Sequence, residues 1–240
     1  MFTKKLKIFT DFLLKGQKNK DTKSHSAKNI LIDCEWEDSD RYITALVIAD
    51  THSSLQYEEV ANALNSGTPD YVFYLGDIPE HDIEIIKNVL KEKNINALQY
   101  GIDGNHDQRG TVKDHDIIDL HGQTAILKDD ITIGGLAGSI RYKNDSRYVL
   151  LTNEESEEIM AKIPYCDILL THDKPCFEEP EYLHAHAGLM GIGTYIQNKH
   201  PQVLLHGHLH DPYIKKHISS GTLIRCCYRV ETIKIPLKGV

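Results

Sequence analysis

The chain has 240 residues, of which 40% are hydrophobic and 26% are charged, so it can bury a full core as one large domain or two small ones. This composition excludes disordered, collagenous and coiled-coil proteins. The formal net charge of −8 argues against an extended nucleic-acid surface, which would need clustered basic residues. Bound divalent cations would add positive charge that this count omits.

Five cysteines are present, and no two of them form a Cys-x-x-Cys pair. An odd number without metal-ligand spacing is typical of reduced thiols that pack as small hydrophobic residues. We therefore expect no disulfide framework and a cytoplasmic location.

Residues 1–29 are predicted to lie apart from a single domain at residues 30–240. The segment begins with three lysines and a short apolar run around Ile8–Leu14, which Asp11 interrupts. This run is too short and too polar to span a membrane, and no cleavage site follows it. Because residues 15–29 are polar, we expect either a flexible segment or a short docking helix.

Strands, polar motifs and helices alternate through the first half of the chain. The stretch Ile43–Ala49 is almost continuously apolar, as expected of a strand buried on both faces. The alternation predicts βαβ units and a largely parallel sheet. The predicted strands are Ile30–Cys34, Ile43–Ala49, Asp70–Leu75 and Ala97–Tyr100, and the predicted helices are Tyr57–Leu64 and Glu80–Lys93.

Short β segments replace this pattern from about Ala125 onward. A helix is predicted at Asn153–Ala161, because Asn at its start and early acidic residues favour a helix N-terminus. The C-terminal tail is typical of a hairpin that turns at Ser219–Gly221, followed by one more strand. The remaining predicted elements are the strands Asp167–Leu170 and Gln202–Leu205 and the helix Leu189–Lys199.

Polar residues follow the predicted strands at the points where those strands end. Asp50, Asp77, His172 and His208 each come just after an apolar run. In open α/β sheets, ligands bind outside the carboxyl ends of the strands. We therefore expect these side chains to converge at one edge of the sheet.

The side chains at these positions suit divalent metal ions. Carboxylate, imidazole and carboxamide groups without thiolate favour Mn²⁺, Fe²⁺, Zn²⁺ or Ni²⁺. One catalytic ion needs about three protein ligands, so the available set is large enough for two. In two-metal sites a carboxylate between the ions screens their repulsion. The candidate ligands are Asp50, His52, Asp77, Asn105, His172, His208 and His210.

Five motifs in this order resemble the calcineurin-like metallophosphoesterases, in particular their small prokaryotic members. The motifs are Asp50-Thr51-His52, Gly76-Asp77, Gly104-Asn105-His106-Asp107, His172 and Gly207-His208-Leu209-His210. The resemblance covers residues 50–210. It implies an α/β fold in which two mixed β-sheets form a sandwich flanked by helices, in four αββα layers.

The resemblance also implies a role for each motif residue. Asp50, His52 and His210 would bind one ion. Asn105, His172 and His208 would bind the other, and Asp77 would bridge them. His106 would face the scissile group, and Asp107 would orient His106 through its second ring nitrogen. A hydroxide on the metals would be the nucleophile.

Two features near the motifs are less specific. Glu80 stands where many relatives carry Asp three residues after the bridging position, which puts no metal ligand in doubt. Gly138-Ser139-Ile140-Arg141-Tyr142 is similar to a segment near the site entrance of some relatives, so Arg141, together with Arg109, is a candidate phosphate contact. Both could equally be surface arginines. His184 and His186 are expected to be loop residues without a ligand role.

These patterns predict metal-dependent hydrolysis of a phosphate ester. The small size favours a small-molecule phosphodiester or phosphomonoester, with a diester slightly ahead. A nuclease, a hydrolase of non-phosphate esters and a non-catalytic interaction scaffold are the alternatives. Scaffold relatives usually lose His106 or several ligands, whereas this chain keeps them all. The physiological substrate, the metal and the oligomeric state stay open.

Overall fold

The computed structural model describes residues 29–36, 39–180, 182 and 184–237. Of the predicted segment 1–29, only Asn29 belongs to this part, and its side chain bonds Phe177 and Gln197. The predicted character of residues 1–28 lies outside the described residues. Within the described ranges, each helix is too short or insufficiently apolar to cross a lipid bilayer.

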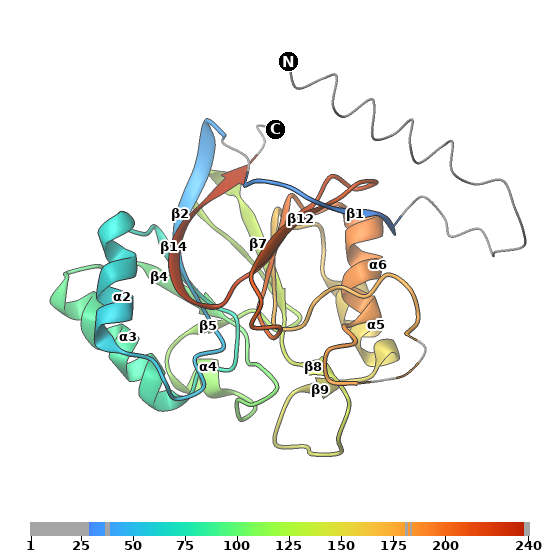
Figure 1. Cartoon of the computed structure of the whole chain (residues 1–240), viewed down its shortest axis with the longest axis horizontal. Helices are drawn as coiled ribbons and strands as arrows, with labels where there is room; N and C mark the ends of the chain where they lie inside the picture. Colours follow the sequence, from blue (N-terminus) through green and yellow to red (C-terminus); the bar gives the residue numbers. More distant parts are fainter. Residues whose placement is uncertain (1–28, 37–38, 181, 183, 238–240) are drawn as a thin grey trace, which may run out of the picture.

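One sheet has five strands in the order β14-β2-β3-β4-β5 (Figure 1). Its members β2 to β5 run parallel to one another, which confirms the predicted βαβ arrangement. The last strand lies antiparallel to β2, with Arg229 opposite Ala49. The strands are β2 (Arg41–Ala49), β3 (Tyr71–Tyr74), β4 (Leu98–Gly101), β5 (Ile118–Asp119) and β14 (Arg229–Leu237).

The second sheet has seven strands in the order β1-β12-β13-β11-β10-β7-β6. Its centre is parallel and its edges are antiparallel, so it is mixed. The predicted C-terminal hairpin is present as β12 and β13. The strands are β1 (Leu31–Asp33), β6 (Thr124–Ile126), β7 (Thr132–Leu136), β10 (Ile168–Thr171), β11 (Val203–His206), β12 (Tyr213–His217) and β13 (Leu223–Cys226).

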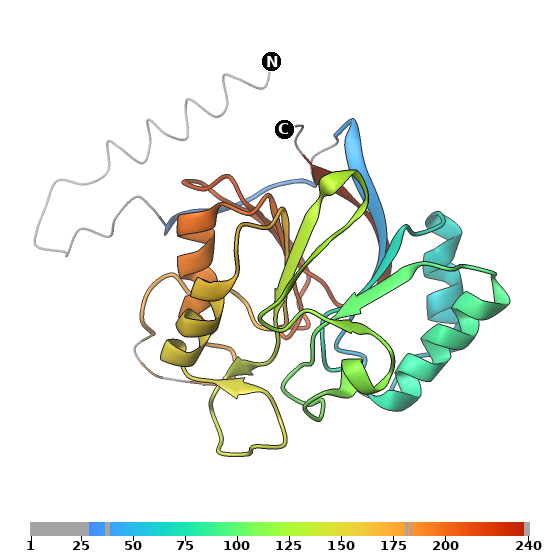
Figure 2. The same ribbon diagram turned by 180° about the vertical axis from the view of Figure 1, so that it is seen from behind.

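The two sheets pack face to face, and helices cover their outer faces (Figures 1 and 2). Strand β2 shows why, because its alternate side chains belong to different cores. Ala45 and Val47 join the core between the sheets, whereas Leu46 and Ile48 pack toward α2 and α3. The structure thus confirms the predicted four-layer αββα sandwich.

The main helices begin and end close to their predicted bounds. Helix α5 starts with a capping box, in which Thr152 and Glu155 each bond the backbone N–H of the other. The helices are α2 (Tyr57–Ala63), α3 (Glu80–Glu92), α4 (Thr111–Asp114), α5 (Asn153–Lys162) and α6 (Met190–Lys199), with short 3₁₀ turns η2 (Leu64–Ser66) and η3 (Lys128–Asp130).

The carboxyl ends of the parallel strands of both sheets lead into neighbouring loops. Backbone hydrogen bonds join these loops, from Asp50 N to Gly76 O at 3.0 Å and from Gly207 N to His172 O at 3.1 Å. A small ribbon of β8 (Ser139–Ile140) and β9 (Leu150–Leu151) lies beside them, with the 141–149 loop extending below it (Figure 2). The sheets therefore bring five chain segments to one place.

Candidate metal centre

Two groups of side chains with metal-binding chemistry lie next to each other at this edge. The first group contains Asp50, His52 and His210, and the second contains Asp77, His172 and His208. In each group the ligand atoms lie within 4.8 Å of one another. The second group is buried, whereas His52 and His210 of the first are exposed. Six of the seven predicted ligands thus lie in these two groups, with Asp77 in the second, and the predicted division of the ligands between two ions stays a prediction.

Asp77 belongs to the second group and also lies close to the first. Its Oδ2 atom is 3.7 Å from His52 Nε2 in the first group and 3.5 Å from His172 Nε2 in the second. Its other oxygen accepts the backbone N–H of His106 at 2.7 Å, which fixes the carboxylate. Burial raises the pKa of Asp77, but the charge and hydrogen bond of His172 outweigh it, so the pKa lies below its ordinary value.

Asn105 completes the second group through His172. Its Oδ1 lies 2.8 Å from His172 Nε2, and His172 Nδ1 donates to Leu75 O at 2.8 Å. Burial lowers the pKa of His172, yet Asp77 and the further contacts raise it to about 10. Both ring nitrogens of His172 therefore face oxygen atoms at hydrogen-bond distance. A metal ion would replace the Nε2 proton.

His208 is held as a neutral imidazole. Burial lowers its pKa to about 3, and its Nε2 donates to Ala185 O at 2.7 Å. This assigns the proton to Nε2 and leaves Nδ1 with a lone pair for an ion. The backbone N–H of His208 donates to Asp50 Oδ2 at 2.8 Å, so the two groups share a link.

One carboxylate oxygen supplies a direct test of the fit to a cation. Asp50 is 1% exposed, and its Oδ1 has no hydrogen-bond partner among the described residues. The nearby His210 Nε2 lies 3.4 Å away. Burial raises the pKa of Asp50, because an unpaired buried charge is unfavourable. A cation at this position would satisfy the oxygen, so the donor set fits a metal.

Glycines allow the loops to approach one another. A Cβ on Gly104 would lie 2.1 Å from Asp77 Oδ1, and one on Gly207 would lie 2.6 Å from Asp50 Oδ2. The backbone is strained at the same place, because Asp50, His52 and Asp77 have φ values of 53°, 48° and 55°. Strained backbone clusters at functional sites, where the surrounding structure enforces it.

His106 and Asp107 occupy different positions around this centre. The His106 ring is exposed and meets the His52 ring edge-on, with centroids 5.4 Å apart. Asp107 is buried, and its carboxylate accepts the backbone N–H groups of Asp77, Ile78 and Gly104. The predicted contact with the His106 ring is not among these hydrogen bonds, so the orienting role of Asp107 stays a prediction. Burial, and then the nearby Asp77, raises the pKa of Asp107 to about 7.

The two predicted arginines are bound to protein acceptors. Arg141 donates to Glu155 Oε2 at 2.6 Å and to Leu150 O, and it lines a cavity of about 370 Å³ at the start of α5. Arg109 donates to Tyr148 O at 3.0 Å. Arg141 is thus part of an ion pair, whereas Arg109 has a neutral acceptor, and their predicted phosphate contacts stay a prediction.

Three further residues contact the candidate ligands. The Tyr142 hydroxyl accepts from Asn105 Nδ2 at 3.2 Å, and the Tyr228 ring stacks on His210 at 5.1 Å. The His186 ring packs edge-on against His208 at 4.8 Å, so this loop histidine lies beside the centre without joining either group. The sequence analysis singled out Tyr142, through the Gly-Ser-x-Arg-Tyr segment, and His186, as a loop histidine, but it gave no signal for Tyr228.

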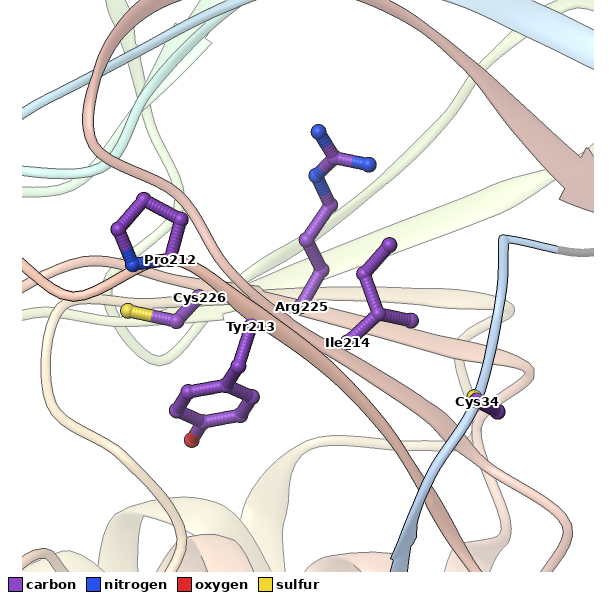
Figure 3. Close-up of a pocket in the computed structure, with 6 residues that line it drawn as sticks. All are labelled: Cys34, Pro212, Tyr213, Ile214, Arg225 and Cys226. Atoms are coloured by element: carbon purple, nitrogen blue, oxygen red, sulfur yellow. The ribbon is translucent and has the colours of Figure 1, made fainter.

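Another cavity, of about 290 Å³, lies along the C-terminal hairpin (Figure 3). None of the predicted site residues lines it. Its Tyr213 and Cys226 side chains point toward the loop before His208, where they bond His206 and Gly207 O. The cavity thus adjoins the end of β11, which leads to His208. Its lining residues are Cys34, Pro212, Tyr213, Ile214, Arg225 and Cys226.

Comparisons with solved structures show similar folds. TT1561 of Thermus thermophilus has a TM-score of 0.57 and 14% identity, covering 81% of this chain and 100% of that one. A dimetal phosphatase from Danio rerio has a TM-score of 0.53 and 10% sequence identity, and the match covers 82% of this chain and 99% of that one. Phosphopantetheinyl hydrolase (PptH) from Mycobacterium tuberculosis has a TM-score of 0.50 and 12% sequence identity, and the match covers 79% of this chain and 95% of that one. At such identities the likeness concerns the fold alone.

The sequence itself was also compared with known proteins. No curated protein matches it. The family model for the calcineurin-like phosphoesterase superfamily domain, however, matches residues 43–226, which is more than half of the chain and includes all five motifs. The chain therefore belongs to the calcineurin-like phosphoesterase superfamily.

Proposed function

We propose that this chain hydrolyses a small-molecule phosphate ester with two bound divalent ions. Asp50, His52 and His210 hold one ion, and His172, His208 and Asn105 hold the other, with Asp77 shared between them. When bound, the ions supply Lewis-acid stabilisation of the phosphoryl group and activate a water molecule for attack.

The observation that carries the proposal is the position of Asp77 Oδ2. It lies within 3.7 Å of an imidazole nitrogen from each group, which is where a shared carboxylate must be. The unpaired Asp50 Oδ1 supports the same assignment, since a buried anionic oxygen without a donor is stabilised by a cation.

The surrounding residues have separate tasks in the reaction. The exposed His106 imidazole stands beside the first group and protonates the leaving oxygen. Asp107 keeps the loops of Asp77 and Gly104 in register through its three backbone hydrogen bonds. Because His106 N donates to Asp77 Oδ1, the proton donor and the shared carboxylate keep a fixed separation.

The engaged arginines favour a diester over a monoester. A phosphomonoester is a dianion near neutral pH, so its recognition usually needs an additional cation such as arginine. Arg141 pairs with Glu155 and Arg147 pairs with Asp145, so their charges are partly neutralised within the protein. A singly charged diester needs less of this neutralisation. We therefore place a small phosphodiester ahead of a monoester.

The test is hydrolysis of bis-p-nitrophenyl phosphate and p-nitrophenyl phosphate by protein loaded with Mn²⁺. We expect turnover of both, faster for the diester, and a loss of roughly 10²–10⁴-fold in His106→Ala. Preference for the monoester would reject the diester assignment, and faster cleavage of an oligonucleotide would favour a nuclease. Metal-loaded protein that cleaves no phosphoester would leave the scaffold alternative.

A further inference from the structure

We infer that Tyr142 is a positioning residue that orients the Asn105 carboxamide toward the second ion. The inference rests on the proposed function, because it concerns a ligand of the proposed metal centre. It starts from the 3.2 Å hydrogen bond in which Asn105 Nδ2 donates to the Tyr142 hydroxyl.

The carboxamide has two possible orientations, and only one can serve a metal. Asn105 Oδ1 faces His172 Nε2 at 2.8 Å, in the direction of the second group. If the amide were flipped, its NH₂ group would face the same position and would repel a cation. The Tyr142 oxygen accepts from Nδ2 and thereby favours the orientation that presents Oδ1.

On its Nδ2 side, Asn105 has the Tyr142 hydroxyl as its hydrogen-bond partner among the described residues. His172 Nε2 lies 2.8 Å from Oδ1, and a bound ion would take the place of that contact. Asn105 is 1% exposed, so water contributes little. The Tyr142 hydroxyl is then the contact that holds the amide on its Nδ2 side.

Tyr142 can do this because its backbone is anchored to the second group. The N–H of Ile140 donates at 3.0 Å to Asp173 Oδ2, and Asp173 directly follows His172. The next residue, Arg141, donates its N–H to Leu151 O at 2.8 Å and its guanidinium to Glu155. Ribbon β8 therefore reaches the metal centre with fixed geometry.

The loop after Tyr142 holds the phenol from its other side. The Lys143 ammonium lies 5.3 Å from the Tyr142 ring centroid and 4.4 Å from that of Tyr148. Arg109, from the loop that carries Asn105 and His106, bonds the backbone of Arg147 and Tyr148. The loop that carries Asn105 thus also contacts the loop that carries Tyr142.

The test is calorimetric titration of metal-stripped protein with Mn²⁺. Wild type should bind two ions. Tyr142→Phe keeps the ring and removes only the hydroxyl, so we expect about 10-fold weaker binding of one ion and unchanged binding of the other. Tyr148→Phe is the matched control, because no hydrogen bond to its hydroxyl occurs among the described residues, and it should bind both ions as wild type does.

A double-mutant cycle separates positioning from a general structural effect. In Asn105→Ala, adding Tyr142→Phe should weaken Mn²⁺ binding no further, because the group that Tyr142 orients is gone. Two results would overturn this inference and leave the proposed function standing. One is that Tyr142→Phe weakens Mn²⁺ binding equally in wild type and in Asn105→Ala. The other is that wild type binds two ions and Tyr142→Phe binds them equally well. Failure of the wild type to bind Mn²⁺ would overturn the proposed function and this inference with it.

Discussion

At the residue scale, Gly104 is where the candidate centre tolerates least change. A Cβ there would lie 2.1 Å from Asp77 Oδ1 and 2.3 Å from Asp77 N. Since Asp77 is buried and held by backbone hydrogen bonds, it cannot move aside without displacing its loop. We expect Gly104→Ala to lower the free energy of unfolding by about 3 kcal/mol, measured by urea denaturation, and to abolish binding of both ions.

Gly110 offers a matched control on the same loop. Its Cβ would meet nothing within 4 Å, but its φ of +95° is unfavourable for alanine. Gly110→Ala should therefore lose only about 1–2 kcal/mol, from backbone strain, and should still bind two ions. A larger loss in Gly110→Ala than in Gly104→Ala would contradict the steric explanation.

The sequence pattern placed the motif residues near strand ends, and the resemblance to the phosphoesterase family divided them between two ions. The hydrogen-bond partners of these residues could not be predicted. Asp107 follows His106 in the chain, yet its carboxylate turns to three backbone N–H groups instead. The Tyr142 and Tyr228 contacts depend on how distant loops pack, which no local pattern encodes.

At the element scale, Asp167 joins three segments of the seven-stranded sheet. Its carboxylate accepts from Thr132 N, Thr132 Oγ1, Tyr165 and Gln202. Burial raises its pKa, but these hydrogen bonds outweigh it and lower the pKa below 3.8. Its contribution to stability is therefore present above pH 4 and is lost as the pH falls through the lower pKa of the folded state.

We expect Asp167→Asn to lower the free energy of unfolding by about 1 kcal/mol at pH 7, and by less at pH 3. Urea denaturation at the two pH values measures this difference. Asp33→Asn on the exposed edge strand β1 is the control and should change stability little at either pH. An Asp167→Asn deficit that grew in acid would contradict the assignment of these hydrogen bonds to the charged carboxylate.

The sequence pattern predicted strand β14 but not its position in the sheet. The tail predicted a hairpin and one more strand, and both are present. Its place beside β2 in the five-stranded sheet was not predicted. There it pairs with β2 from Arg229 opposite Ala49 to Leu237 opposite Arg41. The two partners are far apart in the sequence, and alternating hydrophobicity marks a strand without naming its neighbour.

At the scale of the whole molecule, the metal centre is the place where the two sheets meet. In the first group, Asp50 follows a strand of the five-stranded sheet and His210 follows a strand of the other. In the second group, Asp77 follows the five-stranded sheet, whereas His172 and His208 follow the seven-stranded one. Bound ions would therefore cross-link the sandwich. A ligand that binds only the folded state at about 100 times its Kd adds about 2.7 kcal/mol of stability.

For a domain of this size, that gain corresponds to a rise in Tm of roughly 5–10 °C per ion. We expect Mn²⁺ to raise the Tm of metal-stripped protein by at least this amount, and chelation to reverse it, as followed by calorimetry. Asp77→Asn should lose most of the rise, because Asp77 Oδ2 serves both groups.

Asp82→Asn separates loss of the shared ligand from loss of a buried negative charge. Asp82 is 0% exposed, its carboxylate has no hydrogen-bond partner among the described residues, and it belongs to neither group. If general electrostatics governed the effect of Mn²⁺, both variants would lose the rise in Tm equally. If the ions bind between the sheets, Asp82→Asn keeps the full rise and Asp77→Asn does not.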